Sequence, residues 1–473
     1  MTGWKGAPEL RVTEVEFYER PVRLRLPFRF GIVTLTEAPQ AFVRVRVAAD
    51  GAEAWGMAAE MLAPKWFDKN PDLSNEANFE QLRRSLCHAA ELYRAGGPGT
   101  AFDLFTGIYG DQIGECGADG LNPLVAGYGP ALLDRAILDG LCRIAGISFF
   151  EAVRRNLPGI RRSTLTPDLD GFDLDGFLAG LAPAPTIHAR HTVGLVDPID
   201  GTETAVGDGL PETLAQVIER YGQRYFKLKV GGHVEADLAR LTEIAAVLDR
   251  LDGPYYCTLD GNEQYRNLDG VMALWLAVQA APRLKRLADA VLFIEQPIAR
   301  GQALATEVGE LSAWKPVIID ESDATLDAFP RARALGYRGV SSKSCKGLYK
   351  SILNRARCAH WNAGAGEIRY FMSAEDLTTQ AGLSVQQDLA LASLIGAGHV
   401  ERNGHHYVNG MAGAPTAEQR AFLAAHPDLY QRADGVVRLS IVGGRIALGS
   451  LAAPGFASAA EPDWTSLKQM QPP

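Results

Sequence analysis

The sequence predicts an α/β protein, a (β/α)8 barrel with an N-terminal α+β capping domain. From about residue 186 onward, short runs of β-branched and aromatic residues alternate with amphipathic stretches, which is typical of repeated βα units. Before about residue 160 the pattern differs, because polar and apolar side chains alternate with period two and helical segments follow. A chain of 473 residues, 47% of them hydrophobic, can bury one large core and a second module.

The composition argues against several classes of protein. A net charge of -9 and the lack of a Lys/Arg block argue against a nucleic-acid partner. The longest apolar runs, such as residues 271–281, are shorter than the ~18–20 residues that span a bilayer, and the N-terminus lacks a signal-peptide pattern. The six cysteines form no CxxC pair, so neither disulfides nor a zinc site are expected. We therefore expect a cytoplasmic protein without a membrane partner.

The capping domain is predicted to span residues 1–162. Within it, residues 11–28 and 40–51 alternate in the way of antiparallel strands. Residues 78–94 and 131–146 have the apolar spacing of helices. These elements predict a sheet and helices that form an α+β unit distinct from the barrel.

The barrel is predicted to span residues 186–415, after a linker at 163–185 that is rich in Asp, Gly and Pro. Helices are predicted at 235–251 and 348–364. Residues 416–473 are expected to return to the capping domain and to end in a loosely ordered tail. The eight candidate strands are 186–195, 225–230, 255–260, 290–295, 316–320, 338–343, 368–373 and 399–403. Eight βα units close most readily into a barrel.

Charged residues end five of these strands. In a (β/α)8 barrel the active site lies at the C-terminal strand ends. Taken singly, the acids could be a turn residue, a solvated edge and a helix N-cap, and a lysine could extend to water. Three acids at consecutive strand ends would repel one another without a cation, and oxygen ligands alone favour Mg²⁺ or Mn²⁺ over zinc. The residues are Lys227 and Lys229 on the second strand, and Asp260, Glu295, Asp320 and Lys343 on the next four.

Two lysines lie one residue apart in the second strand. Strand alternation directs Lys227 and Lys229 to the same side, into the barrel. The second and sixth strands of eight lie opposite each other, so Lys229 and Lys343 would flank a substrate. A neighbouring ammonium and a divalent cation would lower the pKa of such a lysine towards neutrality. These parts suit removal of a proton α to a carboxylate through an enediolate.

Five stretches of the chain occur in the order FKLKVGG, TLDGNEQY, FIEQPI, IIDESDATLD and SSKSCKGLYKSILNRAR. These motifs resemble the enolase superfamily, and within it the muconate-lactonizing enzyme subgroup. The resemblance extends from about residue 10 to 450. A helix at 129–153 resembles the one by which that family's capping domain meets the barrel. The superfamily is known for a Lys or His base with Mg²⁺ at the enediolate.

The resemblance implies a role for each residue at the strand ends. It makes Lys229 and Lys343 the acid/base pair, with Lys227 supporting the substrate carboxylate and depressing the pKa of its neighbour. Asn262 and Glu321 match positions that orient a ligand or the sixth-strand lysine. It also implies a homo-oligomer. The implied metal ligands are Asp260, Glu295 and Asp320.

Substrate recognition is expected where the chain departs from the family pattern. Segments 20–39 and 60–69 match capping loops over the barrel mouth. The chain is roughly 100 residues longer than the subgroup, and SAEDLT (373–378) and ERNGHHY (401–407) stand where dipeptide epimerases carry Asp-x-Asp, which argues against a dipeptide substrate. The candidates for substrate contact are Arg29, Phe30, Trp66, Glu375 and His405.

The sequence therefore predicts a Mg²⁺-dependent isomerase or lyase that acts on a small carboxylic acid. Racemisation, epimerisation, cycloisomerisation and β-elimination all remain open. One alternative is an aldolase that forms a Schiff base through Lys229 or Lys343, which borohydride trapping would identify, although it leaves the three acids unexplained. Another is a non-catalytic descendant that only binds a carboxylate.

Overall fold

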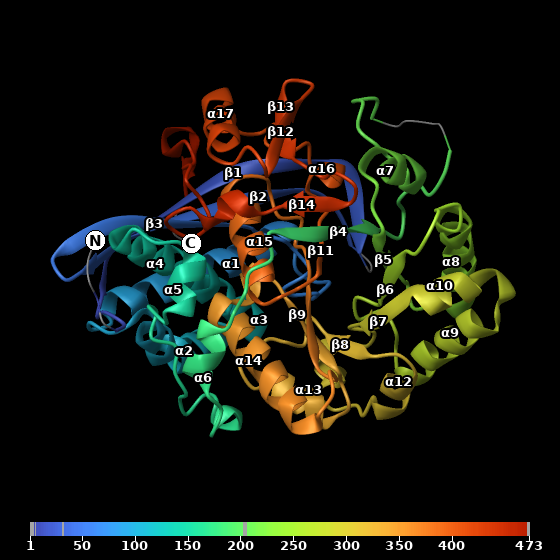
Figure 1. Ribbon diagram of the computed structural model, residues 1–473, viewed down its shortest axis with the longest axis horizontal. Coiled ribbons are helices and arrows are strands. Elements are labelled where there is room, and N and C mark those ends of the chain that lie inside the picture. The colour runs from blue at the N-terminus through green and yellow to red at the C-terminus, as the bar shows by residue number, and fades with distance from the viewer. Residues whose placement is uncertain (1–3, 5, 31–32, 202–205, 471–473) are drawn as a thin grey trace.

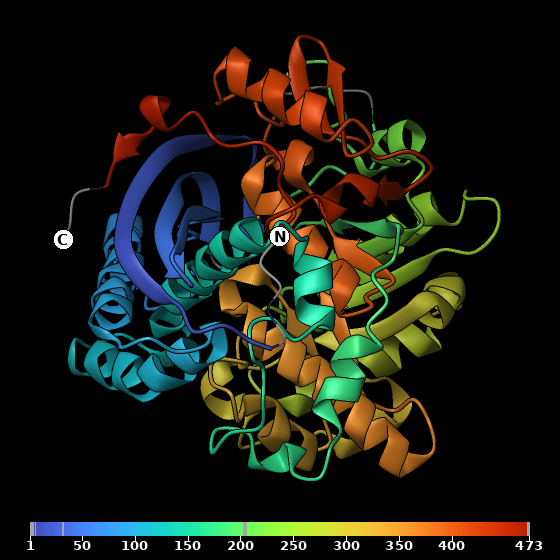
Figure 2. The ribbon, with the colours of Figure 1, turned by 60° about the vertical axis from the view of Figure 1, so that its left-hand side comes forward.

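A computed structural model describes residues 4, 6–30, 33–201 and 206–470. It consists of an N-terminal antiparallel sheet with helices and a closed barrel of eight parallel strands surrounded by helices (Figure 1). This confirms the predicted fold class. In Figure 2 the capping domain, blue to teal, lies beside the barrel, green to orange, and the C-terminal segment in red lies along both.

The barrel closes in sequence order. Each strand pairs in parallel with the next, and the last strand pairs with the first through Val400 and Ala189. Because all eight strands run parallel in a closed barrel, their C-terminal ends meet at one rim. The strands are β4 (Thr186–Val193), β5 (Tyr225–Lys229), β6 (Tyr256–Asp260), β7 (Val291–Glu295), β8 (Val317–Ile319), β9 (Gly339–Ser342), β10 (Phe371–Ala374) and β11 (His399–Glu401).

Helices connect successive barrel strands and cover the outside of the barrel. Their buried faces form a core with the outward side chains of the strands, as in α8, where Leu241, Ile244 and Leu248 are buried. They are α7 (Leu214–Tyr221), α8 (Val234–Leu248), α9 (Leu268–Ala280), α10 (Lys285–Ala290), α11 (Arg300–Ala303), α12 (Gly309–Trp314), α13 (Ala328–Ala334), α14 (Leu348–Ala365) and α15 (Leu383–Leu394), with 3-10 turns at η2 (Pro282–Leu284) and η3 (Ser344–Lys346).

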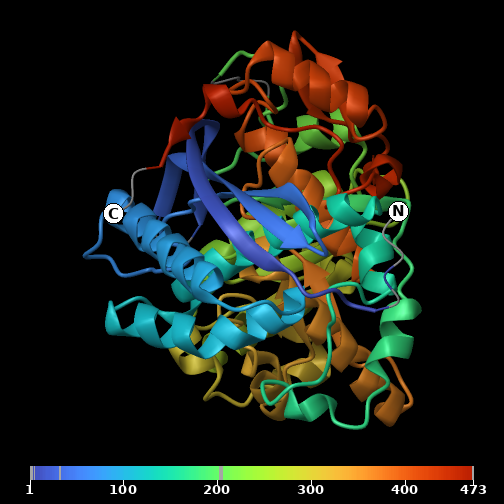
Figure 3. The same cartoon turned by 90° about the vertical axis from the view of Figure 1, so that its left-hand side faces the viewer.

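The capping domain packs helices against a twisted sheet. Helix α4 approaches the sheet so closely at Gly56 and Gly140 that a Cβ on Gly56 would lie 2.0 Å from the carbonyl oxygen of Ala136. Figure 3 shows the sheet on one side of α1 and α2. The elements are β1 (Arg11–Phe30), β2 (Val33–Ala49), β3 (Ala52–Met61), α1 (Asn75–Ala95), α2 (Ala101–Ala118), α3 (Pro123–Ala126), α4 (Tyr128–Ala145) and α5 (Phe149–Arg154).

Segment 20–39, which was expected to be a loop, continues β1 and β2 as a hairpin. The register shifts between Arg23 and Phe28, so β1 carries extra residues there and bends. In this bulge Arg25 forms an ion pair of 2.7 Å with Asp208 and donates to the carbonyl of His406. The bulge therefore fastens the hairpin to the barrel rim.

The linker and the C-terminal segment both contact other parts of the chain. The linker contains η1 (Pro167–Leu169) and α6 (Leu174–Ala179). Near the C-terminus, Phe456 stacks on Phe149 at 3.8 Å, and β15 pairs with β1. The C-terminal elements are α16 (Gly404–Tyr407), α17 (Thr416–Ala425), β12 (Tyr430–Ala433), β13 (Val436–Leu439), β14 (Arg445–Ala447), η4 (Gly449–Ala452), η5 (Trp464–Ser466) and β15 (Lys468–Gln469). Among the helices in the described ranges, none has the length and apolar character needed to cross a bilayer.

Candidate active site

A cavity lies at the C-terminal ends of the barrel strands, beneath the capping domain. Its empty space, including the mouth, is about 470 Å³. Side chains from both domains enclose it, as expected for a site built on a barrel rim. The lining residues are Phe28, Leu35, Ala63, Trp66, Lys227, Lys229, Asn262, Lys343, Asp376, Leu377, Thr378, Glu401 and Asn403.

The three strand-end acids lie on neighbouring strands. Asp260 at the end of β6 pairs in register with Glu295 at the end of β7, and Asp320 follows β8. All three are fully buried. The side-chain oxygen of Gln296 accepts a hydrogen bond of 2.9 Å from the backbone N–H of Asp320, which ties the ends of β7 and β8 together.

Lys227 lies at the centre of a buried cluster of carboxylates. Its ammonium lies 2.8 Å from Asp260, 2.9 Å from Glu295, 2.8 Å from Glu375 and 3.1 Å from Glu401. Burial alone would lower the pKa of Lys227, but these four charges raise it well above its usual value. Lys227 is therefore a fixed cation that holds four acids together.

Lys229 and Lys343 lie on opposite walls of the barrel. Lys229 is the last residue of β5 and Lys343 directly follows β9, and these two strands are four apart in the ring of eight. Lys229 contacts Asp260 and donates to the side-chain oxygen of Asn262, while Lys343 donates to Asp320 at 2.6 Å. Both line the same cavity, so a ligand there would have one lysine on each side.

The electrostatics of the site reflect crowded negative charge. Burial raises the pKa of Glu295 well above its usual range, and Asp260 and Glu375 raise it further. Burial would also raise the pKa of Asp320, but Lys343 and Lys346 hold it well below that range. The sequence predicted a lowered pKa for the lysine that acts as the base. For Lys343 this is wrong: burial lowers its pKa, but the charge of Asp320 raises it above the usual value.

The donor chemistry of Asp260, Glu295 and Asp320 fits a hard divalent cation. Glu295 Oε2 lies 2.9 Å from the Lys227 ammonium yet accepts no aligned hydrogen bond, so this buried atom has an unused lone pair. In their present orientations each carboxylate turns towards a lysine. Across the described ranges, no three His, Cys, Asp or Glu side chains converge closely enough to hold a metal ion without rearrangement.

Asn262 and Glu321 form a chain that leads to Lys229. Asn262 accepts from Lys229, and its amide donates to Glu321 Oε1 at 3.2 Å. Sequence reasoning expected this pair to orient a ligand or the sixth-strand lysine, whereas the structure places it at the second-strand lysine. Asn262 has a φ of 40°, a left-handed conformation that directs its side chain towards β5.

Two aromatic side chains of the capping domain cover the lysines. Trp66 is buried, and the Lys343 ammonium lies 4.4 Å from its ring centre. The Lys229 ammonium likewise lies 6.0 Å from the ring centre of Phe28. Of the other two candidates in this domain, Arg29 is exposed and the side chain of Phe30 lies outside the described part of the structure.

The loop that carries Trp66 is bonded to the barrel. The guanidinium of Arg300 donates to the carbonyls of Trp66 and Phe67, each at 2.8 Å, and pairs with Glu263 at 2.8 Å. Lys69 adds an ion pair of 2.6 Å with Glu263. These bonds fix the indole over the barrel mouth.

The remaining two candidates for substrate contact lie away from the cavity surface. Glu375 is fully buried beneath Lys227, where it also pairs with Arg190. His405 is buried on α16, with its ring 4.7 Å from that of Tyr221.

Of the site residues predicted from the sequence, only Glu375 and His405 come from the ends of β10 and β11 or from the loops that follow them. It missed Glu401, which accepts from Lys227, and Asp376, which pairs with Arg402. It also missed Thr378 and Asn403 on the cavity wall. The departures SAEDLT and ERNGHHY were the signal for these residues, because they follow the last two barrel strands.

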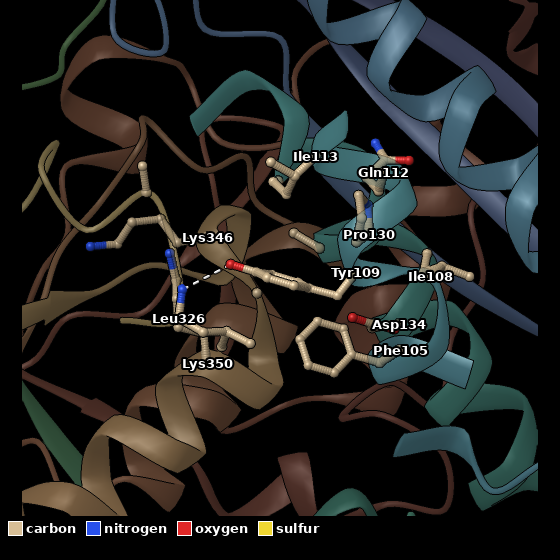
Figure 4. A pocket seen from close by; sticks show the side chains of 14 residues that line it. Phe105, Ile108, Tyr109, Gln112, Ile113, Pro130, Asp134, Leu326, Lys346 and Lys350 are labelled. Atoms are coloured by element: carbon tan, nitrogen blue, oxygen red, sulfur yellow. Dashed lines mark hydrogen bonds between the residues drawn. The ribbon is translucent and has the colours of Figure 1, made fainter. Parts of the chain in front are cut away.

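A second cavity lies between α2, α4 and the loops after β8 and β9 (Figure 4). Its walls include Phe105, Ile108 and Leu326, and the N–H of Leu326 donates to the hydroxyl of Tyr109 at 2.9 Å. The stem of Lys346 reaches past it, so that the ammonium contacts Ser341 at 2.8 Å. This cavity is an apolar gap between the domains, next to the strand-end site.

The chain was compared with family models, curated proteins and solved structures. Residues 210–399 match the family model described as enolase C-terminal domain-like. Comparison with curated proteins gave no match. The structural comparison found many similar chains.

Three solved structures illustrate the similarity in fold. The L-Ala-D/L-Glu epimerase from Bacillus subtilis is 14% identical, with 95% of this chain and 99% of that chain covered and a TM-score of 0.58. The N-succinyl Arg/Lys racemase from Bacillus cereus is 16% identical, with coverage of 95% and 96% and a TM-score of 0.59. An enolase from Bradyrhizobium complexed with magnesium and mandelic acid is 16% identical, with coverage of 96% of both chains and a TM-score of 0.57.

Proposed function

We propose that the protein is a Mg²⁺-dependent enzyme that removes a proton α to a carboxylate, and the match of residues 210–399 to the enolase C-terminal domain-like model supports this. The reaction passes through an enediolate and ends as a racemisation, epimerisation, cycloisomerisation or β-elimination of a small carboxylic acid. The supporting observation is the position of Lys229 and Lys343 on opposite walls of one cavity, with three acids at the strand ends between them.

In this proposal the two lysines act on opposite faces of the α-carbon. One removes the proton, and the other either returns a proton or stabilises charge as an ammonium. Asp260, Glu295 and Asp320 hold Mg²⁺, with Mn²⁺ as a substitute. The bound ion supplies positive charge where the enediolate oxygens develop negative charge. That some similar structures contain magnesium supports this assignment.

The remaining groups support the two lysines. Asn262 orients the Lys229 ammonium through its side-chain oxygen, and Lys69 and Glu321 fix Asn262 in turn. Lys227 keeps the acids of β6, β7, β10 and β11 together. We further propose a cytoplasmic homo-oligomer, which the six free cysteines and the family resemblance support.

The test is exchange of the α-proton with solvent. A set of carboxylic acids incubated with enzyme and Mg²⁺ in D₂O should show deuterium at the α-carbon by NMR. Lys343→Ala should keep exchange for one enantiomer and Lys229→Ala for the other, while overall turnover of a racemase substrate falls by at least ~10²-fold in both. Exchange at the wild-type rate in both variants would remove the lysines from the mechanism.

A further inference from the structure

The cavity has a charged floor and an apolar wall. The floor consists of the strand-end lysines with Asn262 and Glu401. The wall comes from three separate segments, which are the β1–β2 hairpin, the loop after β3 and the loop after β10. Its members are Phe28, Leu35, Ala63, Trp66 and Leu377. The part of a ligand that projects away from the strand ends would therefore meet apolar side chains.

Lys229 and Lys343 are assigned by the proposed function to the reacting carbon. Every other charged side chain that lines the cavity has a partner within the described ranges that is not a proposed metal ligand. A second charged group, at the end of a ligand away from those two lysines, would thus be buried without a counter-ion, which disfavours binding. Arg29, a cation of the covering hairpin, is exposed and does not line the cavity. The pairs are Lys227 with Glu401 and Asp376 with Arg402.

A polar residue, Thr378, lines the cavity next to Leu377 of the apolar wall. It is 7% exposed, and its hydroxyl has no hydrogen-bond partner among the described residues. Its φ of 56° is rare for a β-branched residue. The backbone is held there by a bond of 2.6 Å from Gln380 to the Thr378 carbonyl, and by one of 2.7 Å from the N–H of Thr379 to Asp376. Such strain is typical of functional sites.

We propose that the substrate is a monocarboxylic acid whose distal group is compact, uncharged and mostly apolar, with one neutral hydrogen-bonding group that meets the Thr378 hydroxyl. This rests on the proposed function for the position of the reacting carboxylate. The apolar wall accommodates the body of the distal group, Thr378 selects its polar atom, and a distal carboxylate or ammonium is rejected because it finds no counter-charge.

Binding to the full-length enzyme saturated with Mg²⁺ tests the proposal. The probes are 3-phenylpropanoate and its 4-hydroxyphenyl and 4-carboxyphenyl analogues, which share one scaffold and differ only at the distal position. Calorimetry should show the phenyl compound binding about 10-fold or more tightly than the 4-carboxyphenyl compound, with the 4-hydroxyphenyl compound tightest. Tighter or equal binding of the 4-carboxyphenyl compound overturns the proposal, as does failure of all three to bind at millimolar concentration.

Substitution of Thr378 tests the hydroxyl. Thr378→Val keeps the β-branched shape and the same backbone demand, so it should lose about 5-fold or more in affinity for the 4-hydroxyphenyl probe only. Thr378→Ser should retain that affinity. Equal losses for all three probes in the valine variant would show that Thr378 only supports the loop. The serine variant keeps the test decisive if the valine variant misfolds, since a weakened serine variant also contradicts the proposal.

The binding assay and the exchange assay can fail separately. If the uncharged acids bind selectively and no carboxylic acid exchanges its α-proton, the proposed function falls while the description of the pocket stands. If a dicarboxylate exchanges its α-proton rapidly, the proposed function stands and the inference about the substrate falls.

Discussion

The ammonium of Lys343 lies 4.4 Å from the ring centre of Trp66, so a lysine of the barrel is covered by an aromatic side chain of the other domain. Phe28 covers Lys229 in the same way at 6.0 Å. Each proposed acid/base group thus has, besides its partners in the barrel, one contact that exists only when the two domains pack together. Cation–π contacts of this kind contribute about 0.5–2 kcal/mol, and the aromatic rings also exclude water.

Removal of one aromatic ring should affect one lysine only. Trp66→Leu should slow the α-proton exchange that survives in Lys229→Ala by about 10-fold, because Lys343 loses its contact. It should leave the exchange in Lys343→Ala nearly unchanged. Phe28→Leu should show the reverse pattern and serves as the matched control. Equal losses in both backgrounds would mean that the rings only hold the domains together.

Loss of one ligand charge should weaken metal binding. Glu295→Gln removes a charge from the proposed Mg²⁺ site, and its affinity for Mg²⁺ by calorimetry should fall about 10-fold or more. Glu310→Gln on exposed α12 is the control and should bind Mg²⁺ as the wild type does. Unchanged affinity in the Glu295 variant would show that the acids hold no metal.

Buried His405 should make the protein less stable in mild acid. Burial lowers its pKa to about 4, with a further contribution from Arg438, while an unfolded histidine keeps a value near 6.5. Below pH 6.5 the unfolded state therefore binds a proton at His405 and the folded state does not. The free energy of unfolding falls as the pH falls towards 4.

Urea unfolding at pH 7.5 and pH 5 measures this effect. For His405 the loss in free energy of unfolding is on the order of 2 kcal/mol. His405→Gln should show a smaller loss between the two pH values, by about that amount, while Lys285→Gln on the exposed surface should behave as the wild type. An identical pH dependence in the His405 variant would contradict a buried neutral imidazole.

The close packing of α4 against the sheet should require a glycine at position 56. Gly56→Ala places a methyl group 2.0 Å from the Ala136 carbonyl oxygen, so the free energy of unfolding should fall by about 3 kcal/mol. Gly114→Ala, in the interior of α2 with open space around it, should instead raise stability by about 0.5–1 kcal/mol. Chemical denaturation of both variants gives the comparison, and a neutral Gly56→Ala would mean that the helix can shift.

The sequence by itself determined the barrel and the charged strand ends. Periodicity predicted eight βα units, and the strands formed at the predicted places because short β-branched runs between amphipathic helices have one favourable arrangement. Alternation with period two was sufficient to predict that Lys227 and Lys229 lie on one side of β5. The positions of Asp260, Glu295 and Asp320 at the ends of predicted barrel strands were sufficient to predict that these acids gather at one rim.

Only the tertiary structure decided what surrounds those residues. The bulge between Arg23 and Phe28 breaks the register of β1, and the structure has Phe28 in the cavity wall and Arg29 exposed. Likewise, Lys343 has a raised pKa because Asp320, 23 residues away in the chain, lies 2.6 Å from it. Periodicity describes neighbours along one strand. Loop conformation and the balance of burial against charge depend on contacts between distant segments, which no local pattern specifies.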